Sequence, residues 1–291
     1  MIVISNKSGQ LANRMIVFAH CMAFSQEYNV AVLGHAFDEY ADFFEGPQKG
    51  LKIKAASVSH FFDRSAFFRH KCFESFRICS KIMRKSHLND LALIKNICLK
   101  NDEEVFLLND PINLPELMSK KICFLSGWGL RAKDLVEKHR DFIANYFTPL
   151  KIYRDSAEEV VSPLKNKFKI VVGIHIRRGD YKNFIGGKYF YDINAYKSAM
   201  DKIADIFGKE KTAFIICSNE NIDLSNFNGL NVFKGPGYFV ADLYALSLCD
   251  YIAGPPSTFS MWASFYGQKP IWMIRNIEQI PTLESFKVSK I

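Results

Sequence analysis

The apolar run FKIVVGIHI at 168–176 constrains the fold more than any other feature of the chain. Apolar residues occupy both of the faces that alternate along a strand, which is typical of a parallel sheet covered by helices on both sides. Shorter apolar runs predict further strands, at 2–5, 30–33, 121–125, 212–217, 232–233, 251–253 and 270–274. Stretches with helical periodicity lie between these runs, at 9–28, 135–147, 194–207, 241–248 and 259–266. This alternation predicts the α/β class.

The chain has 291 residues, which is long enough for two domains of this kind. Pro149 and the polar stretch 154–162 are interpreted as the crossing point between them. We therefore expect one Rossmann-like domain over 1–155, with a basic helical insertion at about 55–100, and a second over 156–291. The two domains are expected to face each other across a cleft that binds the ligand.

The net charge of +8 favours an anionic partner, which can be a phosphorylated ligand, an acidic lipid surface or a nucleic acid. Basic residues gather at 61–85, between phenylalanines at roughly helical spacing. A basic amphipathic helix of this kind can rest on an anionic membrane. The alternative is a helix whose phenylalanine face packs on the core. We favour this alternative, because so many exposed phenylalanines would be costly.

The cysteines and the absence of targeting segments predict a cytoplasmic protein. The seven cysteines occur singly, most of them in apolar runs, so we expect reduced, buried thiols. The sequence has no CxxC or HExxH spacing for zinc. It also shows neither a signal peptide nor an uncharged apolar run of about 18 residues.

Three polar clusters follow predicted strands, where open α/β sheets bind their ligands. The first contains Gly9, Asn13 and Arg14 at the start of a helix. Free backbone N–H groups at such a position attract anions, and the two side chains can add donors. A plain helix start with a solvated arginine explains this cluster equally well.

The second cluster, HIRRGD at 175–180, ends the long apolar strand. Strand alternation puts His175 and Arg177 on the same face. An arginine fork matches a phosphate bidentately, and His175 can add a hydrogen bond or, if protonated, a charge. Asp180 can orient a neighbouring guanidinium. The position at the end of a buried strand favours a binding function over a surface ion pair.

The third cluster is GPPSTFS at 254–260, between a strand and a helix. Ser257 is a natural N-cap, and its hydroxyl, that of Thr258 and the N–H groups of the first turn can cradle a phosphate. Plain capping is the alternative. Two such clusters in one half suggest a nucleotide diphosphate. Because no Asp-x-Asp pair is evident, an arginine and a helix N-terminus would neutralise the leaving group, and we expect neither a metal nor a cofactor.

These motifs resemble those of the inverting fucosyltransferases with the GT-B fold, most closely the bacterial α-1,2-fucosyltransferases of glycosyltransferase family eleven. The HxRRGDY motif of that family is present without change at 175–181. Its G-x-L-x-N-x-M and Ser-Ser-Phe-Ser-x-Trp segments are similar to 9–15 and 257–262. Its Asp-Leu-x-x-(Leu/Met)-Ser-x-Cys helix matches 242–249, and its strand ending in Ser-Asp-Asp resembles 217–220.

The resemblance implies a GT-B fold and a metal-independent, inverting transfer of L-fucose from GDP-fucose to a glycan hydroxyl. It implies an α-1,2 linkage and a place in surface polysaccharide or O-antigen synthesis. By this analogy Arg177 binds the β-phosphate and stabilises the leaving GDP, and His175 positions the donor. Further donor contacts are implied for Arg178, Asp180, Ser218, Asp242, Ser257, Thr258 and Phe259, and contacts with the fucose or the acceptor for Gly9, Asn13 and Arg14.

No general base is evident, and Asp38 and Glu39, which follow the second strand, are the candidates. The expected partners are the nucleotide sugar and a glycan acceptor, which a lipid can carry. A peripheral contact with the inner membrane surface through 61–85 would suit such an acceptor.

Other functions stay open at this stage. The same fold can use a different nucleotide sugar. An adhesion module would use Arg178-Gly179-Asp180, but this tripeptide closes a buried strand in a chain without a signal peptide. A nucleic-acid-binding protein would explain the charge, but the basic segment lacks strand aromatics of the RNP type.

Overall fold

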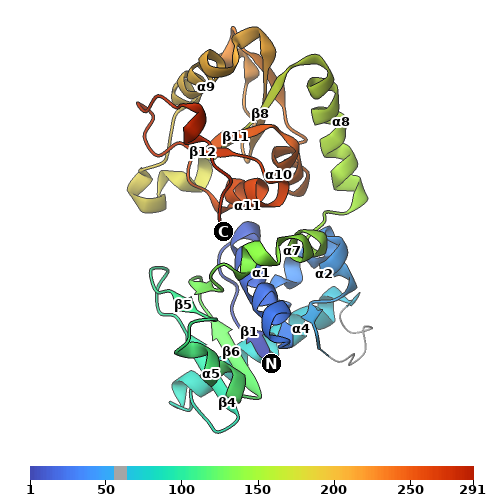
Figure 1. The fold of residues 1–291 in the computed structure, drawn as a ribbon, viewed down its shortest axis with the longest axis vertical. Coiled ribbons are helices and arrows are strands. Elements are labelled where there is room, and N and C mark those ends of the chain that lie inside the picture. Colours follow the sequence, from blue (N-terminus) through green and yellow to red (C-terminus); the bar gives the residue numbers. More distant parts are fainter. Residues whose placement is uncertain (56–63) are drawn as a thin grey trace. The chain divides into compact units, whose positions relative to one another are not determined.

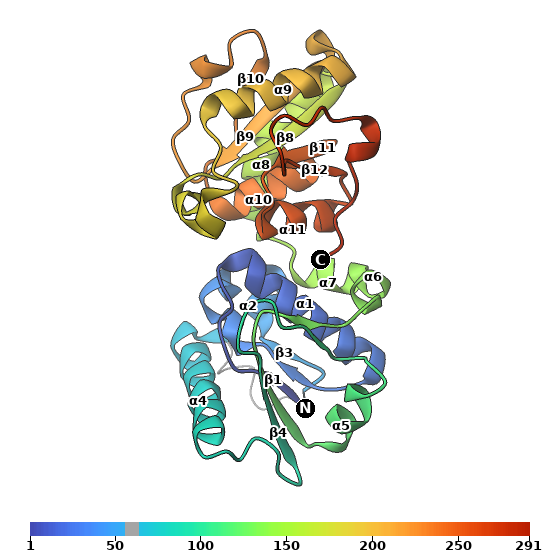
Figure 2. The same ribbon diagram turned by 90° about the vertical axis from the view of Figure 1, so that its left-hand side faces the viewer.

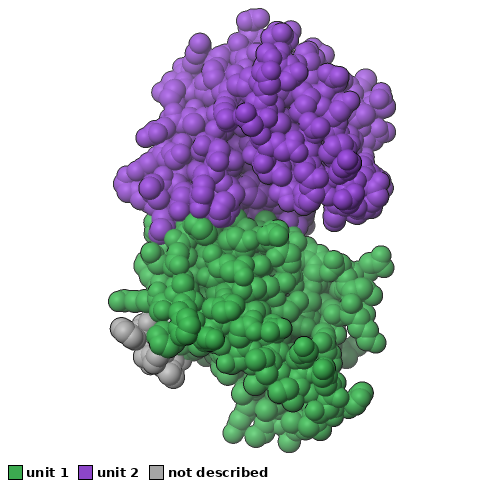
Figure 3. Space-filling model, turned by 180° about the vertical axis from the view of Figure 1, so that it is seen from behind, with its two compact units in different colours: residues 1–148 green, residues 149–291 purple. Residues whose placement is uncertain are grey.

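The computed structural model describes residues 1–55 and 64–291 (Figure 1). The chain divides into two compact units, which we call unit 1 (1–148) and unit 2 (149–291) (Figure 3). The boundary expected at 155/156 falls inside helix α8 (Lys151–Lys167), which belongs to unit 2. The polar stretch 154–162 is therefore helix and not a crossing segment. Its polar residues form the outer side of α8, while Ala157, Val161 and Leu164 are buried at helical spacing.

Unit 1 is built on a five-stranded sheet with the order β3-β2-β1-β6-β4. All neighbouring pairs are parallel except β2 and β3. The strands are β1 (Ile2–Ile4), β2 (Val32–Leu33), β3 (Lys52–Ile53), β4 (Ile94–Cys98) and β6 (Ile122–Ser126). A separate pair of strands is formed by β5 (Phe106–Leu107) and β7 (Leu130–Arg131).

The main helices of unit 1 are α1 (Leu11–Tyr28) and α4 (Ala66–Lys85), and Figure 2 shows them on opposite sides of the sheet. The 3₁₀ helix η1 (His35–Phe43) follows β2 and packs against α4. Shorter helices are α2 (Glu45–Lys49), α5 (Asn113–Ser119), α6 (Leu135–Lys138) and α7 (Arg140–Tyr146). The helix expected over 135–147 is thus broken at His139, which leaves helical geometry.

Helix α4 contains most of the basic segment singled out in the sequence. Phe73 is buried, and Phe76 and Met83 pack against the core cluster of Val3, Leu33 and Phe124. The structure therefore confirms core packing for one side of this helix. Phe61, which the sequence placed on the same face, lies outside the described residues.

Unit 2 is built on a five-stranded, fully parallel sheet with the order β10-β9-β8-β11-β12. The strands are β8 (Ile170–Ile176), β9 (Thr212–Ser218), β10 (Asn231–Lys234), β11 (Tyr251–Gly254) and β12 (Ile271–Met273). The longer helices are α8, α9 (Ile193–Phe207), α10 (Phe239–Leu248) and α11 (Thr258–Gly267). Five 3₁₀ helices complete the described part of the unit: η2 (Gly179–Lys182), η3 (Phe184–Gly187), η4 (Lys209–Lys211), η5 (Leu224–Phe227) and η6 (Leu283–Ser285).

The core of unit 2 lies mainly between the sheet and α9. Val172, Ile174 and Ile176 point from β8 into a cluster with Tyr196 and Met200 of α9. The other side chains of β8 point to the opposite face, where α10 packs against both α8 and α11 (Figures 1 and 2). Because both faces are covered, the apolar character of this strand is explained.

The cysteines and the helix lengths complete the description of the fold. All seven cysteines are free, but Cys79 is exposed and Cys72 and Cys98 are half-buried, so the expectation of buried thiols is wrong for these three. Cys79 is exposed because it lies on the outer side of α4. None of the described helices is both long and apolar enough to cross a lipid bilayer.

Candidate active site

The strand register of unit 2 brings the second and third clusters to one edge of the sheet. His175 pairs with Cys217 and Ile176 with Ser218, so β8 and β9 end side by side. Ile174 pairs with Ala253 of β11 on the other side of β8, so Gly254 follows at the same edge. Ser218, the residues after His175 and the residues after Gly254 therefore meet at the carboxyl edge, where α/β sheets bind ligands.

Arg177 is held in one orientation by its neighbours. Its Nε and Nη2 atoms donate to the two carboxylate oxygens of Asp180, at 2.9 and 2.8 Å. Its backbone N–H donates to the hydroxyl of Tyr196 at 3.2 Å, and its guanidinium lies 5.8 Å from the ring centre of Tyr181. The side chain is 26% exposed, so one part of the fork remains accessible. Asp180 thus orients a guanidinium, as the sequence predicted.

Tyr181 joins the second cluster to the third. Its hydroxyl donates to the carbonyl oxygen of Pro256 at 2.6 Å. Strands β8 and β11 also lie very close together at this edge. A Cβ atom on Gly254 would lie 2.6 Å from the carbonyl oxygen of His175, so no larger residue fits there. The two clusters form one connected arrangement.

His175 is a neutral, buried imidazole in this arrangement. Burial, with a further effect from the Arg177 charge, lowers its pKa to about 3. The ring lies 5.0 Å from the ring of Phe259, and its Nδ1 atom makes no hydrogen bond with the residues that the structure describes. The protonated form that the sequence left open is therefore excluded near neutral pH, because an unpaired charge would be buried.

Ser257 caps helix α11, since its hydroxyl accepts a hydrogen bond from the Phe259 N–H at 3.3 Å. Thr258 is the first residue of this helix. This capping interaction accounts for the orientation of the Ser257 hydroxyl. The phosphate cradle stays a prediction.

Arg178 is directed to a different set of partners from Arg177. Its guanidinium lies 5.4 Å from the ring centre of Phe190, and its Nη1 atom is 3.8 Å from a carboxylate oxygen of Glu220. The other oxygen of Glu220 accepts the Gly179 N–H at 2.9 Å. Sequence reasoning missed Glu220 and Phe190 as supports of this arginine. The position of Glu220 just after β9 was the available signal.

A small hollow near the ends of β9 and β10 contains Asp242. Its walls are apolar at Ile222 and Leu224 and polar at Ser218, Lys234 and Asp242. Asp242 accepts the Gly237 N–H at 2.8 Å, and burial raises its pKa to about 6 in spite of this bond. The sequence singled out Ser218 and Asp242, but nothing in the pattern indicated Lys234, Ile222 or Leu224.

The first cluster lies at the carboxyl edge of the other sheet, in unit 1. Gly9 has φ +60°, and a Cβ atom there would lie 2.1 Å from the Asn13 Nδ2 atom. Arg14 donates from Nε to the Gly9 carbonyl oxygen at 3.0 Å and from Nη1 to Glu39 at 2.7 Å. These contacts fold the loop after β1 against the start of α1.

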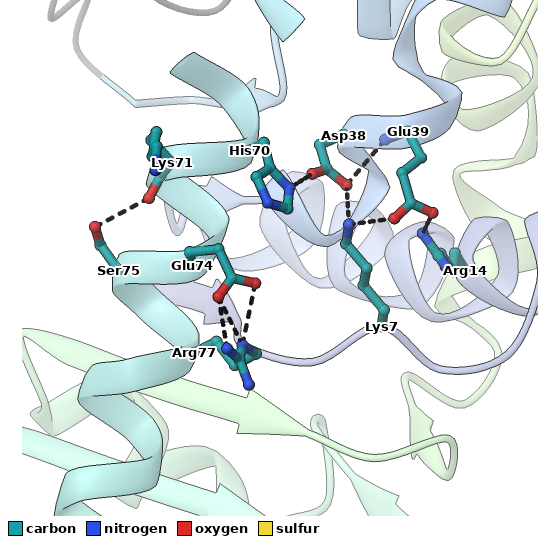
Figure 4. Close-up of polar contacts among 9 residues, drawn as sticks. All are labelled: Lys7, Arg14, Asp38, Glu39, His70, Lys71, Glu74, Ser75 and Arg77. Atoms are coloured by element: carbon teal, nitrogen blue, oxygen red, sulfur yellow. Dashed lines mark hydrogen bonds and ion pairs between the residues drawn. The ribbon is translucent and has the colours of Figure 1, made fainter. Parts of the chain in front are cut away.

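The two candidate bases, Asp38 and Glu39, take part in a charged network (Figure 4). Lys7 binds Asp38 at 2.7 Å and Glu39 at 2.6 Å, and Glu39 also binds Arg14. The other oxygen of Asp38 lies 2.9 Å from the Nδ1 atom of His70. Burial alone would raise the pKa of Glu39, but the hydrogen bonds from Lys7 and Arg14 outweigh it and leave the pKa lowered.

Asp38 itself is badly placed for a direct role as a base. Its side chain is only 3% exposed, and both oxygens already accept from neighbouring groups. Glu39 is 51% exposed, but two cations hold it in its charged form. Neither carboxylate therefore fits the role of direct base that the sequence suggested.

The model of the family described as Glycosyl transferase family 11 matches residues 113–280, more than half of the chain. The chain belongs to this family. The assignment confirms the resemblance seen in the motifs and makes the protein a fucosyltransferase, with GDP-fucose as the donor of the family's reaction. The matched range includes both clusters of unit 2. It begins after the first cluster, which therefore lies outside it. No curated protein matches the sequence.

Solved structures support the fold. The fucosyltransferase NodZ from Bradyrhizobium aligns with a TM-score of 0.54 and 14% identity, over 96% of this chain and 97% of that one. A mutant of Arabidopsis thaliana FUT1 in complex with GDP aligns with a TM-score of 0.52 and 13% identity, over 98% and 73%. POFUT1 in complex with GDP-fucose also reaches 0.52, with 12% identity, over 91% and 93%. Two parallel-sheet units with these likenesses confirm the expected GT-B fold.

Proposed function

We propose that the protein transfers L-fucose from GDP-fucose to a hydroxyl of a glycan acceptor, with inversion and in an α-1,2 linkage. The observation that carries this proposal is the pre-oriented fork of Arg177 at the carboxyl edge of the unit 2 sheet. Asp180 occupies Nε and Nη2, and no hydrogen bond from Nη1 is found among the described residues. Nη1 and the accessible edge of the fork can therefore bind a diphosphate without breaking the Asp180 contact.

The proposed chemistry is a single displacement. The acceptor oxygen forms a bond to the anomeric carbon of fucose while the bond from that carbon to the β-phosphate oxygen breaks. The electron pair of this bond leaves with GDP. Arg177 stabilises the negative charge that develops on the phosphate, which fixed donors do well in a site that excludes water. We propose that this step needs no metal.

The neighbouring residues are assigned to the rest of the donor. The buried His175 packs against the half-buried Phe259, and the N–H groups at the start of α11, with Ser257 and Thr258, suit the phosphates. Asp242 is assigned to the nucleoside, since a carboxylate accepts from the N–H groups of guanine and the apolar walls beside it suit a planar base.

Two further residues of unit 2 are assigned to the donor, and three residues of unit 1 to the acceptor or the fucose. Arg178 and Ser218 flank the phosphates at the ends of β8 and β9. We assign Gly9, Asn13 and Arg14 of unit 1 to the acceptor or the fucose.

We also propose that the outer side of α4 rests on an anionic lipid surface, which suits a lipid-linked acceptor. Phe67, Ile78 and Ile82 are 63%, 48% and 57% exposed on this helix. Lys71, Arg77, Lys81, Arg84 and Lys85 lie among them and are exposed. Exposed apolar side chains between lysines and arginines have the charge and the reach that such a surface attracts.

The test of the donor site is fucose transfer by Arg177→Ala and Arg177→Lys. Loss of a donor aimed at developing charge typically lowers kcat by about 10²–10³-fold. Lysine keeps the charge but not the fork, so it should recover only part of the loss. The matched control is Arg275→Ala, an exposed arginine of the same unit, which should keep wild-type turnover. Wild-type turnover in Arg177→Ala would contradict the proposal.

A protein of the same fold that uses another nucleotide sugar is the second candidate. It shares the arginine and the helix start, and the composition of the Asp242 hollow is the feature that argues for guanine. A panel of GDP- and UDP-sugars separates the two candidates.

A further inference from the structure

His70 and Asp38 form a carboxylate–imidazole pair in unit 1, and the roles assigned above do not use it. The Nδ1 atom of His70 lies 2.9 Å from Oδ2 of Asp38. The carboxylate is 3% exposed and the imidazole 53% exposed. A buried acid thus fixes a histidine whose side chain is about half-exposed.

The pairing determines which nitrogen carries the proton. An ionised carboxylate only accepts hydrogen bonds, so Nδ1 of His70 is the donor. In the neutral ring, Nε2 then has a free electron pair. Asp38 also stabilises the imidazolium that forms when Nε2 takes up a proton. A buried carboxylate that orients a histidine in this way is a recurring means of making it a general base.

Other contacts hold the pair in place. Lys7 binds the second oxygen of Asp38, and its ammonium group also lies 4.6 Å from the ring centre of Phe73 on α4. Figure 4 shows that the network continues from Asp38 through Lys7 and Glu39 to Arg14. The pair therefore belongs to the cluster at the carboxyl edge of the unit 1 sheet.

The charges that face His70 come from three elements. Asp38 of η1 contacts the ring directly, and Lys7 lies behind Asp38 in the loop after β1. Glu74, one turn along α4, interacts electrostatically with His70 and is held by Arg77. Two carboxylates and one ammonium group thus lie near the ring.

The transfer reaction needs a proton acceptor, and the other titratable groups described above are occupied. Asp180 is bound in the fork of Arg177, and His175 and Asp242 are buried. Asp38 is covered, and Glu39 is paired with two cations. Among the titratable groups named in this paragraph and the one before, His70 alone combines a side chain that is 53% exposed with an orientation fixed by a buried carboxylate.

We propose that His70 is the general base that takes the proton of the acceptor hydroxyl, and that Asp38 is its positioning residue. The inference rests on the function proposed above. As the acceptor oxygen bonds to the anomeric carbon and GDP leaves, the hydroxyl proton moves to Nε2 of His70. The imidazolium then releases the proton to solvent. A positioned base of this kind contributes about 10²–10⁴-fold to the rate.

The test compares His70→Gln and His70→Ala with the wild type in fucose transfer. We expect kcat to fall by about 10²–10⁴-fold while the KM for GDP-fucose and the binding of GDP stay within about threefold. The fall of kcat/KM at acidic pH, which reports protonation of the base, should disappear. Added imidazole should restore part of the turnover of His70→Ala.

Asp38 is tested by pH dependence and by conservative replacement. Asp38→Asn should lower kcat and move the acidic limb of the profile to lower pH, because it removes the negative charge that favours the imidazolium. Asp38→Glu should recover more activity than Asp38→Asn. An equal loss in both variants with an unchanged profile would contradict the positioning role.

His87→Asn is the matched control, because this exposed histidine follows α4 and serves no assigned role. It should keep wild-type kinetics. If the wild type transfers fucose and His70→Gln keeps full turnover, the assignment of His70 as the base is overturned, while the proposed function still stands. A fall in GDP binding and melting temperature that accounts for the lost activity would show a structural role and overturn it too. A wild type that transfers no fucose would instead contradict the proposed function.

Discussion

At the residue scale, the buried acid Asp242 is expected to lower stability while serving the ligand. Its carboxyl pKa is raised from 3.8 to about 6, and burial is the main cause. The folded protein therefore binds this proton more tightly than the unfolded chain does. The resulting stabilisation is complete below pH 3.8 and is lost as the pH rises through about 6.

We predict that Asp242→Asn raises the free energy of unfolding near pH 7.5 by at most about 3 kcal/mol, since the shift is roughly two pKa units. The amide keeps an acceptor for the Gly237 N–H but carries no charge. The gain should nearly vanish at about pH 3, below both the unfolded pKa of 3.8 and the folded pKa of about 6, where the acid is mostly protonated in both states. The same variant should bind GDP about tenfold more weakly, because a charged acceptor is lost.

Denaturant unfolding at the two pH values, with GDP calorimetry, measures both effects. Asp205→Asn, an exposed acid on α9, is the control and should change neither. A variant that is less stable than the wild type at pH 7.5 would contradict the account of Asp242.

Gly254 gives a second prediction at this scale. A methyl group there would lie 2.6 Å from the backbone oxygen of His175, and backbone cannot easily move within a sheet. Gly254→Ala should therefore cost about 1–3 kcal/mol of stability, as overpacking does. At Gly179 the added atom would meet only the end of the Asn219 side chain, so Gly179→Ala should cost clearly less. Thermal unfolding of the two variants measures the difference. Equal losses of stability in both variants would contradict the close approach of β8 and β11 at Gly254.

The sequence could predict which polar residues meet at the unit 2 edge, because strand order in a parallel sheet follows from apolar runs and each cluster follows a strand. It could not predict how they are paired. Arg177 and Arg178 are adjacent in sequence, but one is held by Asp180 and the other lies near Glu220, which follows β9. The His70–Asp38 pair also escaped notice, because the two residues are 32 positions apart on elements that contain no shared motif.

At the scale of elements, apolar runs predicted all five strands of the unit 2 sheet but missed β4 of unit 1, together with the two-residue strands β3, β5 and β7. Strand β4 carries Lys95 and Asn96, so it lacks an apolar run. Asn96 is buried because Ser80 of α4 and Asn89 satisfy its side chain, with Ser80 donating at 2.7 Å and Asn96 donating to Asn89 at 2.9 Å. A buried polar network of this kind has no signal in hydrophobicity alone.

Helix α4 shows how one pattern can support two interpretations. Its inner side contains Phe73, Phe76 and Met83, which pack on the sheet, and its outer side exposes other apolar residues. The sequence pattern could not separate the two sides, because apolar residues occur on both. Core packing therefore leaves room for the membrane contact proposed for the outer side.

We predict that the protein binds vesicles of phosphatidylglycerol and not those of phosphatidylcholine alone. Lys81→Glu should weaken binding about tenfold, since each basic residue contributes about 1 kcal/mol near an anionic surface. Ile82→Glu should also weaken it, because the exposed apolar side chain is lost. Vesicle co-sedimentation measures both. Lys209→Glu, on a 3₁₀ helix of unit 2, is the control, and equal weakening by all three variants would favour non-specific attraction.

At the scale of the whole molecule, each unit carries its polar residues at the carboxyl edge of its own sheet. This follows from parallel strand order, because the loops at that edge are free to carry side chains that the buried sheet cannot hold. We propose that unit 2 binds the donor and that unit 1 binds the acceptor.

Metal independence is a further prediction at this scale. If Arg177 and the start of α11 neutralise the leaving diphosphate, fucose transfer should continue in EDTA at the rate seen without it. Assays with EDTA, with added magnesium and with added manganese test this directly. A loss of activity in EDTA that either metal restores would contradict the proposed role of Arg177.

The measurement that tests the central claim most directly is donor binding by calorimetry, with GDP, GDP-fucose, GDP-mannose, UDP-glucose and UDP-GlcNAc. We predict that the wild type binds GDP and GDP-fucose and not the UDP-sugars. Arg177→Ala should weaken GDP binding by about 10–100-fold, the value of a charged hydrogen bond. A preference for a UDP-sugar, or equal GDP binding by wild type and variant, would contradict a GDP-fucose site built around Arg177.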